Sequence, residues 1–286
     1  MKIQDGCNQF CSYCIIPYAR GPIRSRKLED ILVEAKRLAK ANFKEIVLTG
    51  IHVASYGKDL KNINLLDVIQ EVSKIDGIER IRLSSIEPTF IDDKFLEKTK
   101  DNKKFCEHFH LSLQSGSNSV LKRMNRKYTT EEYKSIVEKI RKYMPDAGIT
   151  TDIIVGFPGE TEEEFQETYE FVKEIGFYRI HVFKYSPRKG TPASKMDEQI
   201  HGSIKHERSE KLISLGEQLA DSFMERFIGR SMEVLFEENK DGYFEGYTTN
   251  YLRVKVEAEK DLHGEILPVK IIDKEKDILI GKIEEF

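Results

Sequence analysis

The sequence lacks long hydrophobic runs. No stretch approaches the roughly 18 consecutive apolar residues of a membrane span, and no signal peptide precedes the first cysteine. These two absences argue against a membrane-inserted or exported protein. We therefore expect a chain that makes no membrane contact and is located in the cytoplasm.

The sequence also has few cysteines, a small net charge and no repeats. Only four of the 286 residues are cysteines, and their spacing does not suggest a disulfide framework. The formal net charge is −3, which argues against nucleic-acid binding through bulk charge but allows local basic patches. The sequence contains no internal repeat and no low-complexity segment. Its length suits one large domain, or a large domain followed by a small one.

The first half of the sequence alternates strand-like and helix-like segments. Short apolar runs predict buried parallel strands at 44–50, 80–85, 109–115, 148–159 and 179–186, and residues 1–4 predict the end of a further first strand. Apolar residues at helical spacing predict helices at 28–41, 65–75, 92–99, 130–143 and 161–175. Such alternation is typical of a parallel sheet covered by helices. We expect an α/β fold with an open, partial (βα)6 barrel.

After residue 186 the alternation stops. Residues 187–202 are rich in turn-forming residues and indicate a linker, and residues 203–227 predict a long helix with one apolar stripe. From residue 229 onward, short β-rich runs separated by glycine predict a small barrel or sandwich of about five strands. The expected organisation is a core domain at 1–225 and a C-terminal β-domain at 226–286.

Three of the four cysteines are clustered. Cys7, Cys11 and Cys14 form a C-x-x-x-C-x-x-C loop, and three thiolates on one loop can each bind an iron of a [4Fe–4S] cluster while the fourth iron stays open. A structural zinc site is the alternative. Zinc needs a fourth protein ligand, which Cys106 or a histidine such as His52 would have to supply from far along the chain. The loop therefore favours an iron–sulfur cluster with an open metal position.

This loop resembles that of the radical-SAM superfamily. In that superfamily S-adenosylmethionine chelates the open iron, and an electron from the cluster cleaves it to methionine and a 5′-deoxyadenosyl radical. The resemblance implies that Tyr13 packs near the adenine and that Thr49 and Gly50 meet the amino group of the cofactor. Ligands of βα barrels bind at the carboxyl ends of the strands, so further cofactor contacts are expected at the later strand ends, from Glu87, Gln114, Asp152 and Gly156.

Four residues near these motifs have more than one interpretation. Cys106 precedes an apolar strand and is expected to be a buried structural thiol rather than a metal ligand. His108 and His110 alternate along one run, so one of them could face the barrel interior or be a hydrogen-bonded core histidine. Glu87 could also be a buried acid on the substrate side.

Four longer stretches resemble one family within the superfamily, the methylthiotransferases: residues 2–26, 110–129, 152–165 and 185–193. The resemblance implies insertion of a methylthio group. The runs CIIPYARGPIRSR and LTGIHVASYG are most similar to the MtaB type, which acts on threonylcarbamoyladenosine beside the tRNA anticodon. The alternatives are MiaB-type methylthiolation of isopentenyladenosine in tRNA, RimO-type methylthiolation of a ribosomal-protein side chain, and a non-catalytic RNA-binding protein with a structural metal.

Members of that family carry an N-terminal domain whose three further cysteines bind a second [4Fe–4S] cluster. This sequence has no second cysteine triplet, and Met1 lies six positions before Cys7. The chain is therefore either a fragment of a longer protein, with the second cluster in the missing part, or a divergent enzyme that lacks this domain, and we expect the fragment. The resemblance also implies a reducing electron donor and a sulfur donor as partners, besides tRNA.

The tail resembles a TRAM domain, a small β-barrel with which such enzymes hold RNA. Its aromatic residues interleave with cations, which suits the unpaired bases of a tRNA loop, and Tyr247 and Arg253 are the expected contacts. Basic residues also cluster near the expected mouth of the core barrel. Arg20, Arg126 and Arg188 are expected to meet phosphates there.

Overall fold

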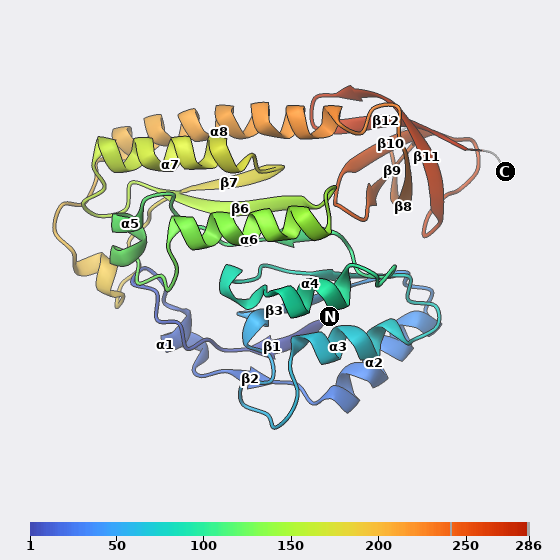
Figure 1. Cartoon of the computed structure of the whole chain (residues 1–286), viewed down its shortest axis with the longest axis horizontal. Coiled ribbons are helices and arrows are strands. Elements are labelled where there is room, and N and C mark those ends of the chain that lie inside the picture. The colour runs from blue at the N-terminus through green and yellow to red at the C-terminus, as the bar shows by residue number, and fades with distance from the viewer. Residues whose placement is uncertain (241, 285–286) are drawn as a thin grey trace.

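The computed structural model describes residues 1–240 and 242–284, and its first part contains two groups of hydrogen-bonded strands (Figure 1). The first group has the order β2-β1-β3-β4 and consists of β1 (Lys2–Asp5), β2 (Arg24–Ser25), β3 (Glu45–Gly50) and β4 (Arg80–Leu83). The second group has the order β5-β6-β7 and consists of β5 (His108–His110), β6 (Gly148–Val155) and β7 (Arg179–Lys184).

Isolated parallel bridges join the two groups. Ile81 pairs with Phe105 and Ile86 pairs with Leu111, which places β5 beside β4. In the described part of the chain, β1, β3, β4, β5, β6 and β7 therefore follow one another in parallel, and β2 adds an antiparallel edge beside β1. The predicted open, partial (βα)6 barrel is confirmed.

Helices flank these strands (Figure 1). The longer ones are α2 (Leu28–Lys40), α3 (Leu65–Ser73), α4 (Asp93–Thr99), α6 (Thr130–Tyr143) and α7 (Glu162–Ile175). Three of them begin with a capping box. The side chain of Asn64, Thr129 or Thr161 accepts a hydrogen bond from the backbone amide three positions later, and the acidic side chain at that later position accepts one from the backbone amide of the capping residue. All five helices lie where the sequence predicts them, to within a few residues.

Short helical turns connect strand ends to the longer helices. They are α1 (Ile16–Arg20), α5 (Asn118–Arg123), η1 (Val53–Ser55), η2 (Pro88–Phe90) and η3 (Pro192–Lys195). The sequence does not predict them, because so few residues show no helical periodicity. The strand predicted at 109–115 is regular only as β5; beyond it the chain leaves the ladder, and Gln114 adopts a φ of +73°, outside the strand region.

The long predicted helix is α8 (Gly202–Glu225), which packs against β7 and α7 (Figure 1). Leu212 and Leu215 are buried on its inner face. A Cβ atom on Gly216 would lie 2.5 Å from Cγ1 of Ile180. The helix therefore approaches β7 more closely than any residue larger than glycine would allow at this position.

The tail forms a closed barrel in the order β10-β12-β11-β8-β9, not a sandwich. Its strands are β8 (Ser231–Lys240), β9 (Tyr243–Thr248), β10 (Arg253–Glu257), β11 (Ile266–Glu275) and β12 (Ile278–Ile283). Phe223 of α8 and Phe227 pack into the apolar core of this barrel, so the domain boundary at 225/226 stays a prediction. Asp241, Glu285 and Phe286 of the predicted domain lie outside the described residues.

The barrel packs against the end of the core at which β4 begins. Arg80 donates to the main-chain oxygen of Tyr247 at 2.7 Å, and Arg82 donates to those of Thr248 and Thr249 at 3.2 and 3.0 Å. Both arginines are buried. Buried cations are tolerated only when they are hydrogen-bonded or paired. The main-chain oxygens of the barrel provide hydrogen-bond acceptors that these two guanidinium groups need.

Two further contacts bring the barrel close to β5 and β6. The ring of Tyr251 stacks on His108 with 4.5 Å between centroids. A Cβ atom on Gly148 would lie 2.2 Å from the main-chain oxygen of Asn250. His108 is therefore the hydrogen-bonded core histidine of the pair that the sequence left open, since its Nε2 also lies 3.1 Å from Oγ1 of Thr150.

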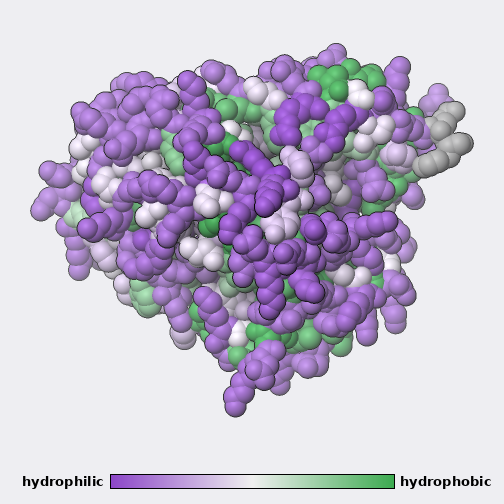
Figure 2. Space-filling view, viewed as in Figure 1, coloured by the Kyte–Doolittle hydropathy of each residue, from purple (hydrophilic) through white to green (hydrophobic). Residues whose placement is uncertain are grey.

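Figure 2 shows a face covered mostly by hydrophilic residues, with small separate hydrophobic areas. Exposed apolar side chains are spread over both halves of the chain, such as Phe43 and Ile272, which is ordinary for a protein surface. None of the described helices combines the length and the apolar character that crossing a bilayer requires.

Candidate cofactor site

The three clustered cysteines lie on the loop that follows β1. Cys7, Cys11 and Cys14 line one cavity of about 160 Å³, and all three are free thiols. Gly6 begins the loop with a φ of +72°, and a Cβ atom there would lie 1.9 Å from the main-chain oxygen of Pro22. Only glycine permits this turn, which brings Cys7 to the cavity.

Contacts from distant segments fix the middle of the loop. The amide of Ser12 donates to the oxygen of Met124 at 3.0 Å, and its hydroxyl donates to the oxygen of Arg123 at 2.8 Å. The amide of Ala193 donates to the oxygen of Ser12 at 2.8 Å. The loop is thus held between the end of α5 and η3. Fixing the thiols before a ligand arrives lowers the entropy cost of binding it.

The spacing of the thiols fits a [4Fe–4S] cluster better than a single zinc ion. Among the described residues, the group of three histidine, cysteine or acid side chains that lies close enough together to hold a single metal ion does not include the three thiols. Tetrahedral zinc with Zn–S bonds of about 2.3 Å would hold its sulfurs roughly 3.8 Å apart. A four-iron cubane spans a larger volume and needs the wider spacing.

The two proposed fourth zinc ligands are occupied otherwise. Cys106 is fully buried, with its Sγ 3.9 Å from Oε2 of Glu45, which confirms the expected structural thiol. His52 does line the cavity, but its ring nitrogens contact Oγ of Ser55 and, at 2.9 Å, Oε2 of Glu87. The structure therefore favours a cluster over zinc.

Burial raises the pKa of the Cys7 and Cys14 thiols above the ordinary value. The protein alone therefore keeps these side chains protonated, and iron would have to displace the protons, because the thiolate is the ligand. Arg126 places a positive charge here, with Nη1 3.3 Å from Sγ of Cys11. That charge favours a thiolate at Cys11 or an anionic group bound in the cavity.

A buried carboxylate forms the polar wall of the cavity. Oε2 of Glu87 accepts a hydrogen bond from Nε2 of Gln9 at 2.6 Å and contacts Nε2 of His52 at 2.9 Å, and Oε1 lies 3.8 Å from Arg126. Burial alone would raise the pKa of Glu87, but the His52 hydrogen bond and the charge of Arg126 outweigh burial and lower it. Glu87 is thus an anion held inside the cavity.

Tyr13 and Gln114 line the same cavity. The ring of Tyr13 packs edge-on against Phe157, with 6.5 Å between centroids, and burial raises the pKa of its hydroxyl well above the ordinary value. Gln114 has left the strand ladder, and its amide donates to the oxygen of Asp152 at 2.8 Å. An aromatic ring beside Cys14 offers a flat surface to a planar base, as expected for Tyr13.

Thr49 and Gly50 do not line the cavity. The amide and the hydroxyl of Thr49 both donate to the main-chain oxygen of Met1, at 2.9 and 3.3 Å. A Cβ atom on Gly50 would lie 2.8 Å from Oε1 of Gln4, so protein fills the space that glycine leaves open. The expectation of direct cofactor contact is therefore not supported at these two positions, because strand pairing occupies them.

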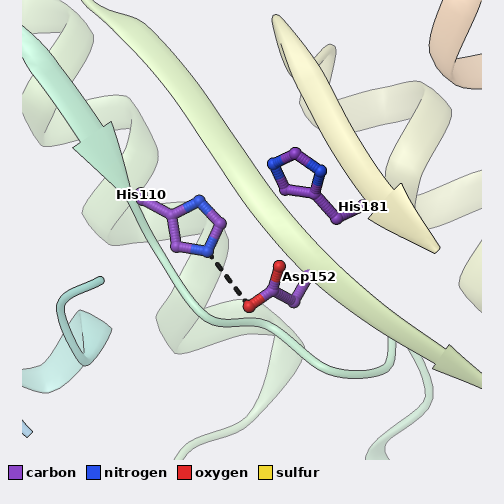
Figure 3. Close-up of side chains that lie close together, drawn as sticks. All are labelled: His110, Asp152 and His181. Atoms are coloured by element: carbon purple, nitrogen blue, oxygen red, sulfur yellow. Dashed lines mark ion pairs between the residues drawn. The ribbon is translucent and has the colours of Figure 1, made fainter. Parts of the chain in front are cut away.

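Gly156 and Asp152 also lie elsewhere. Gly156 faces α8, where a Cβ atom would lie 2.3 Å from Cγ of Lys205, and its amide donates to Oε1 of Glu160 at 2.8 Å. Asp152 points toward His110 (Figure 3) and does not line the cysteine cavity. The glycine at 156 thus serves the approach of a helix, which a single sequence cannot distinguish from the approach of a ligand.

Two of the predicted RNA contacts are exposed beside the cysteine loop. Arg20 ends α1, directly after the loop, and Arg188 lies two residues before Gly190, whose added Cβ would lie 3.6 Å from Ile15. Arg126 does not belong with them, since its side chain is only 8% exposed and forms part of the cavity wall. The predicted phosphate contact by Arg126 is therefore not supported.

The predicted RNA contacts in the tail are engaged within the protein. Tyr247 stacks on Tyr251 with 4.9 Å between centroids, and Arg82 lies 4.6 Å over the ring of Tyr251. Arg253 pairs with Glu245. The expectation that Tyr247 and Arg253 are open to RNA bases is not supported, because these side chains join the barrel to the core or pair within it.

The cavity wall includes residues that the sequence did not single out, namely Gln9, Ile51 and Ser112. Gln9 lies inside the cysteine loop, and the other two follow β3 and β5. For Ile51 and Ser112, the position after a strand is the signal that the sequence offers. This signal does not predict which side chain points into the cavity, since that depends on the packing of the whole barrel.

Comparisons with known proteins agree with this geometry. The family model described as the Radical SAM superfamily matches residues 1–172. The chain is 46% identical over 278 residues to the threonylcarbamoyladenosine tRNA methylthiotransferase MtaB of Bacillus subtilis (strain 168), covering 95% of this chain and 62% of that protein. It is 44% identical over 275 residues to the tRNA-2-methylthio-N(6)-dimethylallyladenosine synthase of Acetivibrio thermocellus, covering 95% of this chain and 57% of that protein. The chain thus spans less than two thirds of the length of these relatives.

Solved structures show the same fold. Coproporphyrinogen III oxidase (HemN) from Escherichia coli, a radical SAM enzyme, matches with a TM-score of 0.54 and 14% identity over 96% of this chain and 66% of its own. The radical S-adenosylmethionine methyltransferase TsrM from Kitasatospora setae matches with a TM-score of 0.57 and 16% identity over 68% of this chain and 38% of its own. The cysteine loop, the partial barrel and the family model that covers more than half of the chain lead to one conclusion: this chain belongs to the radical SAM superfamily.

Proposed function

We propose that this chain is the radical-SAM part of a tRNA methylthiotransferase and that Cys7, Cys11 and Cys14 hold its [4Fe–4S] cluster. The observation that carries the proposal is the convergence of three free thiols on one cavity whose wall contains Tyr13 and Glu87. When a cluster and S-adenosylmethionine are bound, they supply a carbon-centred radical that can remove a hydrogen atom from a substrate.

The residues of the chain position and enclose these groups. Glu87 is an anion inside the cavity and can accept a hydrogen bond from the amino group of S-adenosylmethionine. Arg126, whose Nη1 lies 3.3 Å from Sγ of Cys11, can balance the negative charge of a thiolate-bound cluster. Tyr13 offers its ring to the adenine. Because Gln9 and His52 both bond to Glu87, the carboxylate is oriented before the cofactor binds.

We infer that the substrate is threonylcarbamoyladenosine in tRNA. The support is the 46% identity to a protein named for that reaction. The second candidate is the dimethylallyl-modified adenosine of tRNA, because several relatives at 42–44% identity are named for it. A RimO-type protein substrate has no comparable support among the relatives described above.

We further propose that the second cluster and the sulfur donor belong to the part of such proteins that this chain does not span. The chain has one cysteine triplet, and the remaining Cys106 is buried away from the cavity. An external electron donor would reduce the cluster. The chain by itself should therefore cleave S-adenosylmethionine without completing methylthiolation.

RNA contact is proposed for the exposed cations at the cavity mouth and for an exposed part of the barrel. Arg20 and Arg188 flank the cysteine loop, and among the described residues neither has a carboxylate within 4.0 Å. Tyr243 is 43% exposed, with Nζ of Lys255 5.5 Å from its ring centroid, although this Nζ also pairs with Glu275 at 2.6 Å. An exposed aromatic ring beside a cation suits an unpaired base, which supports a TRAM-like role for the barrel.

The test is anaerobic reconstitution with iron and sulfide, followed by reduction in the presence of S-adenosylmethionine. The parent chain should bind about four irons and form 5′-deoxyadenosine. Cys11→Ala should lose both properties, while Cys106→Ala, the matched control, should keep both. Full cleavage by Cys11→Ala would contradict the cluster assignment. Binding assays with tRNA that carries either modified adenosine then distinguish the two substrates.

A further inference from the structure

Three side chains from neighbouring strands converge in the partial barrel, apart from the cysteine cavity (Figure 3). His110 comes from β5, Asp152 from β6 and His181 from β7. The register explains the meeting, because Asp152 is the direct partner of His181. Each residue offers one ligand atom, and these atoms all lie within 4.8 Å of one another.

Thr150 orients the ring of His110. Nδ1 of His110 lies 2.9 Å from Oγ1 of Thr150, which leaves Nε2 directed at Oδ2 of Asp152 at 3.1 Å. When Nδ1 carries the proton and donates to Thr150, the Nε2 lone pair and the carboxylate face each other. Two acceptors at this distance repel unless a cation or a proton lies between them. Metal-binding histidines commonly have their second nitrogen held in this way.

His181 completes the set from the opposite side of Asp152 (Figure 3). In the described part of the chain, its ring makes no hydrogen bond that would hold it there. Among these residues, then, none competes with a metal ion for the ring nitrogens of His181.

A simple ion pair between His110 and Asp152 explains only two of the three side chains. It gives no reason for a second histidine to converge on the same carboxylate. Ser112 and Gln114, which follow His110 along the chain, line the cysteine cavity. His110, Asp152 and His181 do not line it, so the three-residue site shares no residue with the cysteine cavity.

We propose that His110, Asp152 and His181 bind a divalent transition-metal ion of the zinc type. Two imidazoles and one carboxylate are a common set for ions of intermediate softness such as Zn²⁺ and Co²⁺. Three protein ligands leave a coordination position open. Water or an oxygen or nitrogen atom of a substrate can fill that position. This inference does not depend on the proposed methylthiotransferase activity.

The test uses Co²⁺, because its visible spectrum reports both coordination number and sulfur ligation. The three clustered thiols would bind Co²⁺ themselves, so the protein is the full chain with Cys7→Ala, Cys11→Ala and Cys14→Ala. We expect about one Co²⁺ per chain, with the absorption of four- or five-coordinate cobalt and no sulfur-to-metal charge-transfer band. Zinc should compete for the same site.

Variants of the ligands decide the assignment. His181→Ala should weaken Co²⁺ binding by at least about tenfold, and so should Asp152→Asn, which keeps the size of the side chain. His263→Ala, an exposed histidine on the barrel, is the matched control and should bind as the parent does. His181 is exposed, so its variant should fold, and circular dichroism checks this.

The spectrum of the hydrated ion, or equal affinity in His181→Ala, would overturn the proposal. Zinc-edge X-ray absorption of the chain that lacks the three clustered thiols should show two imidazoles at about 2.0 Å from the ion.

Discussion

At the scale of single residues, Glu87 is the acceptor on which the cavity wall depends. Its carboxylate is bonded to Gln9 and His52 and lies near Arg126, in a position that is 7% exposed. Glu87→Gln keeps the shape but replaces one acceptor with a donor, so one of these partners loses its hydrogen bond. We expect the free energy of unfolding to fall by about 1–3 kcal/mol, measured by urea denaturation of the cluster-free protein.

The control for this variant is Glu79→Gln, because Glu79 is exposed. Its free energy of unfolding should change by less than about 0.5 kcal/mol. If both variants were equally stable, the network around Glu87 would contribute nothing to the fold, and its role would be confined to ligand binding.

Glu164 links acid stability to one carboxylate, whose main partner is Arg123, with further hydrogen bonds from Ser119 and the amide of Thr161. Two hydrogen bonds from Arg123, at 2.8 and 2.6 Å, lower the pKa of Glu164 to about 2, from an ordinary value of 4.5. A carboxyl group whose pKa is lower in the folded state stabilises the fold above its unfolded pKa, and this contribution disappears as the pH falls from about 4.5 toward 2. Glu164→Gln should therefore lose about 1–2 kcal/mol at neutral pH and show a flatter acid limb.

Unfolding midpoints measured over this pH range test the prediction. Glu138→Gln is the control, since Glu138 is an exposed acid on α6 that forms no ion pair among the described residues. An acid limb in Glu164→Gln as steep as that of the parent would mean that other carboxyl groups cause the acid sensitivity.

At the scale of secondary-structure elements, the close packing of α8 on β7 depends on Gly216. In an exposed helix, Gly→Ala stabilises by about 1 kcal/mol. At Gly216 the new methyl group would lie 2.5 Å from Ile180, so we expect Gly216→Ala to destabilise by about 1–3 kcal/mol instead. Gly202→Ala is the matched control, because nothing lies within 4 Å of its Cβ position. It should be neutral or stabilising, and a stabilising Gly216→Ala would show that α8 can move away from β7.

Elements differ in how far the sequence alone predicts them. The helix that begins at Glu162 has an amphipathic stripe and a capping box at Thr161, both of which are local signals, so its bounds could be predicted. The cysteine loop is equally local. The wall of the cavity is not: Glu87, His52 and Arg126 come from separate loops, and only the closure of the barrel brings them together. Glycines at 50 and 156 could not be assigned, because glycine serves protein packing and ligand approach alike.

At the scale of the whole molecule, the core and the barrel are expected to unfold together. The end of α8 contributes Phe223 and Met224 to the barrel core, and Tyr178 of the main domain packs in the same cluster. Removing residues 230–286 would expose these side chains and leave the guanidiniums of Arg80 and Arg82 without their main-chain acceptors. We expect the thermal midpoint of the remaining chain to fall by at least about 5 °C.

Calorimetry of the full chain should accordingly show a single transition. The result also limits deletion experiments on RNA binding, since a shortened chain would lose stability as well as an RNA-contacting surface. Substitution of the exposed Tyr243 is the better probe of RNA contact. Equal thermal midpoints with and without the barrel would contradict the shared core.

Arg80 and Arg82 hold the barrel by donating hydrogen bonds to main-chain oxygens of residues 247–249. Every amino acid presents the same carbonyl group, so these hydrogen bonds place almost no demand on which side chains the barrel carries at 247–249, although Tyr251 beside them contacts the core through its ring. Over evolutionary time, the outer surface of the barrel could then change to suit a different RNA while the joint stayed intact. The seating of one domain on the other would be inherited separately from the choice of nucleic acid, which would let related enzymes exchange specificities without redesigning their architecture.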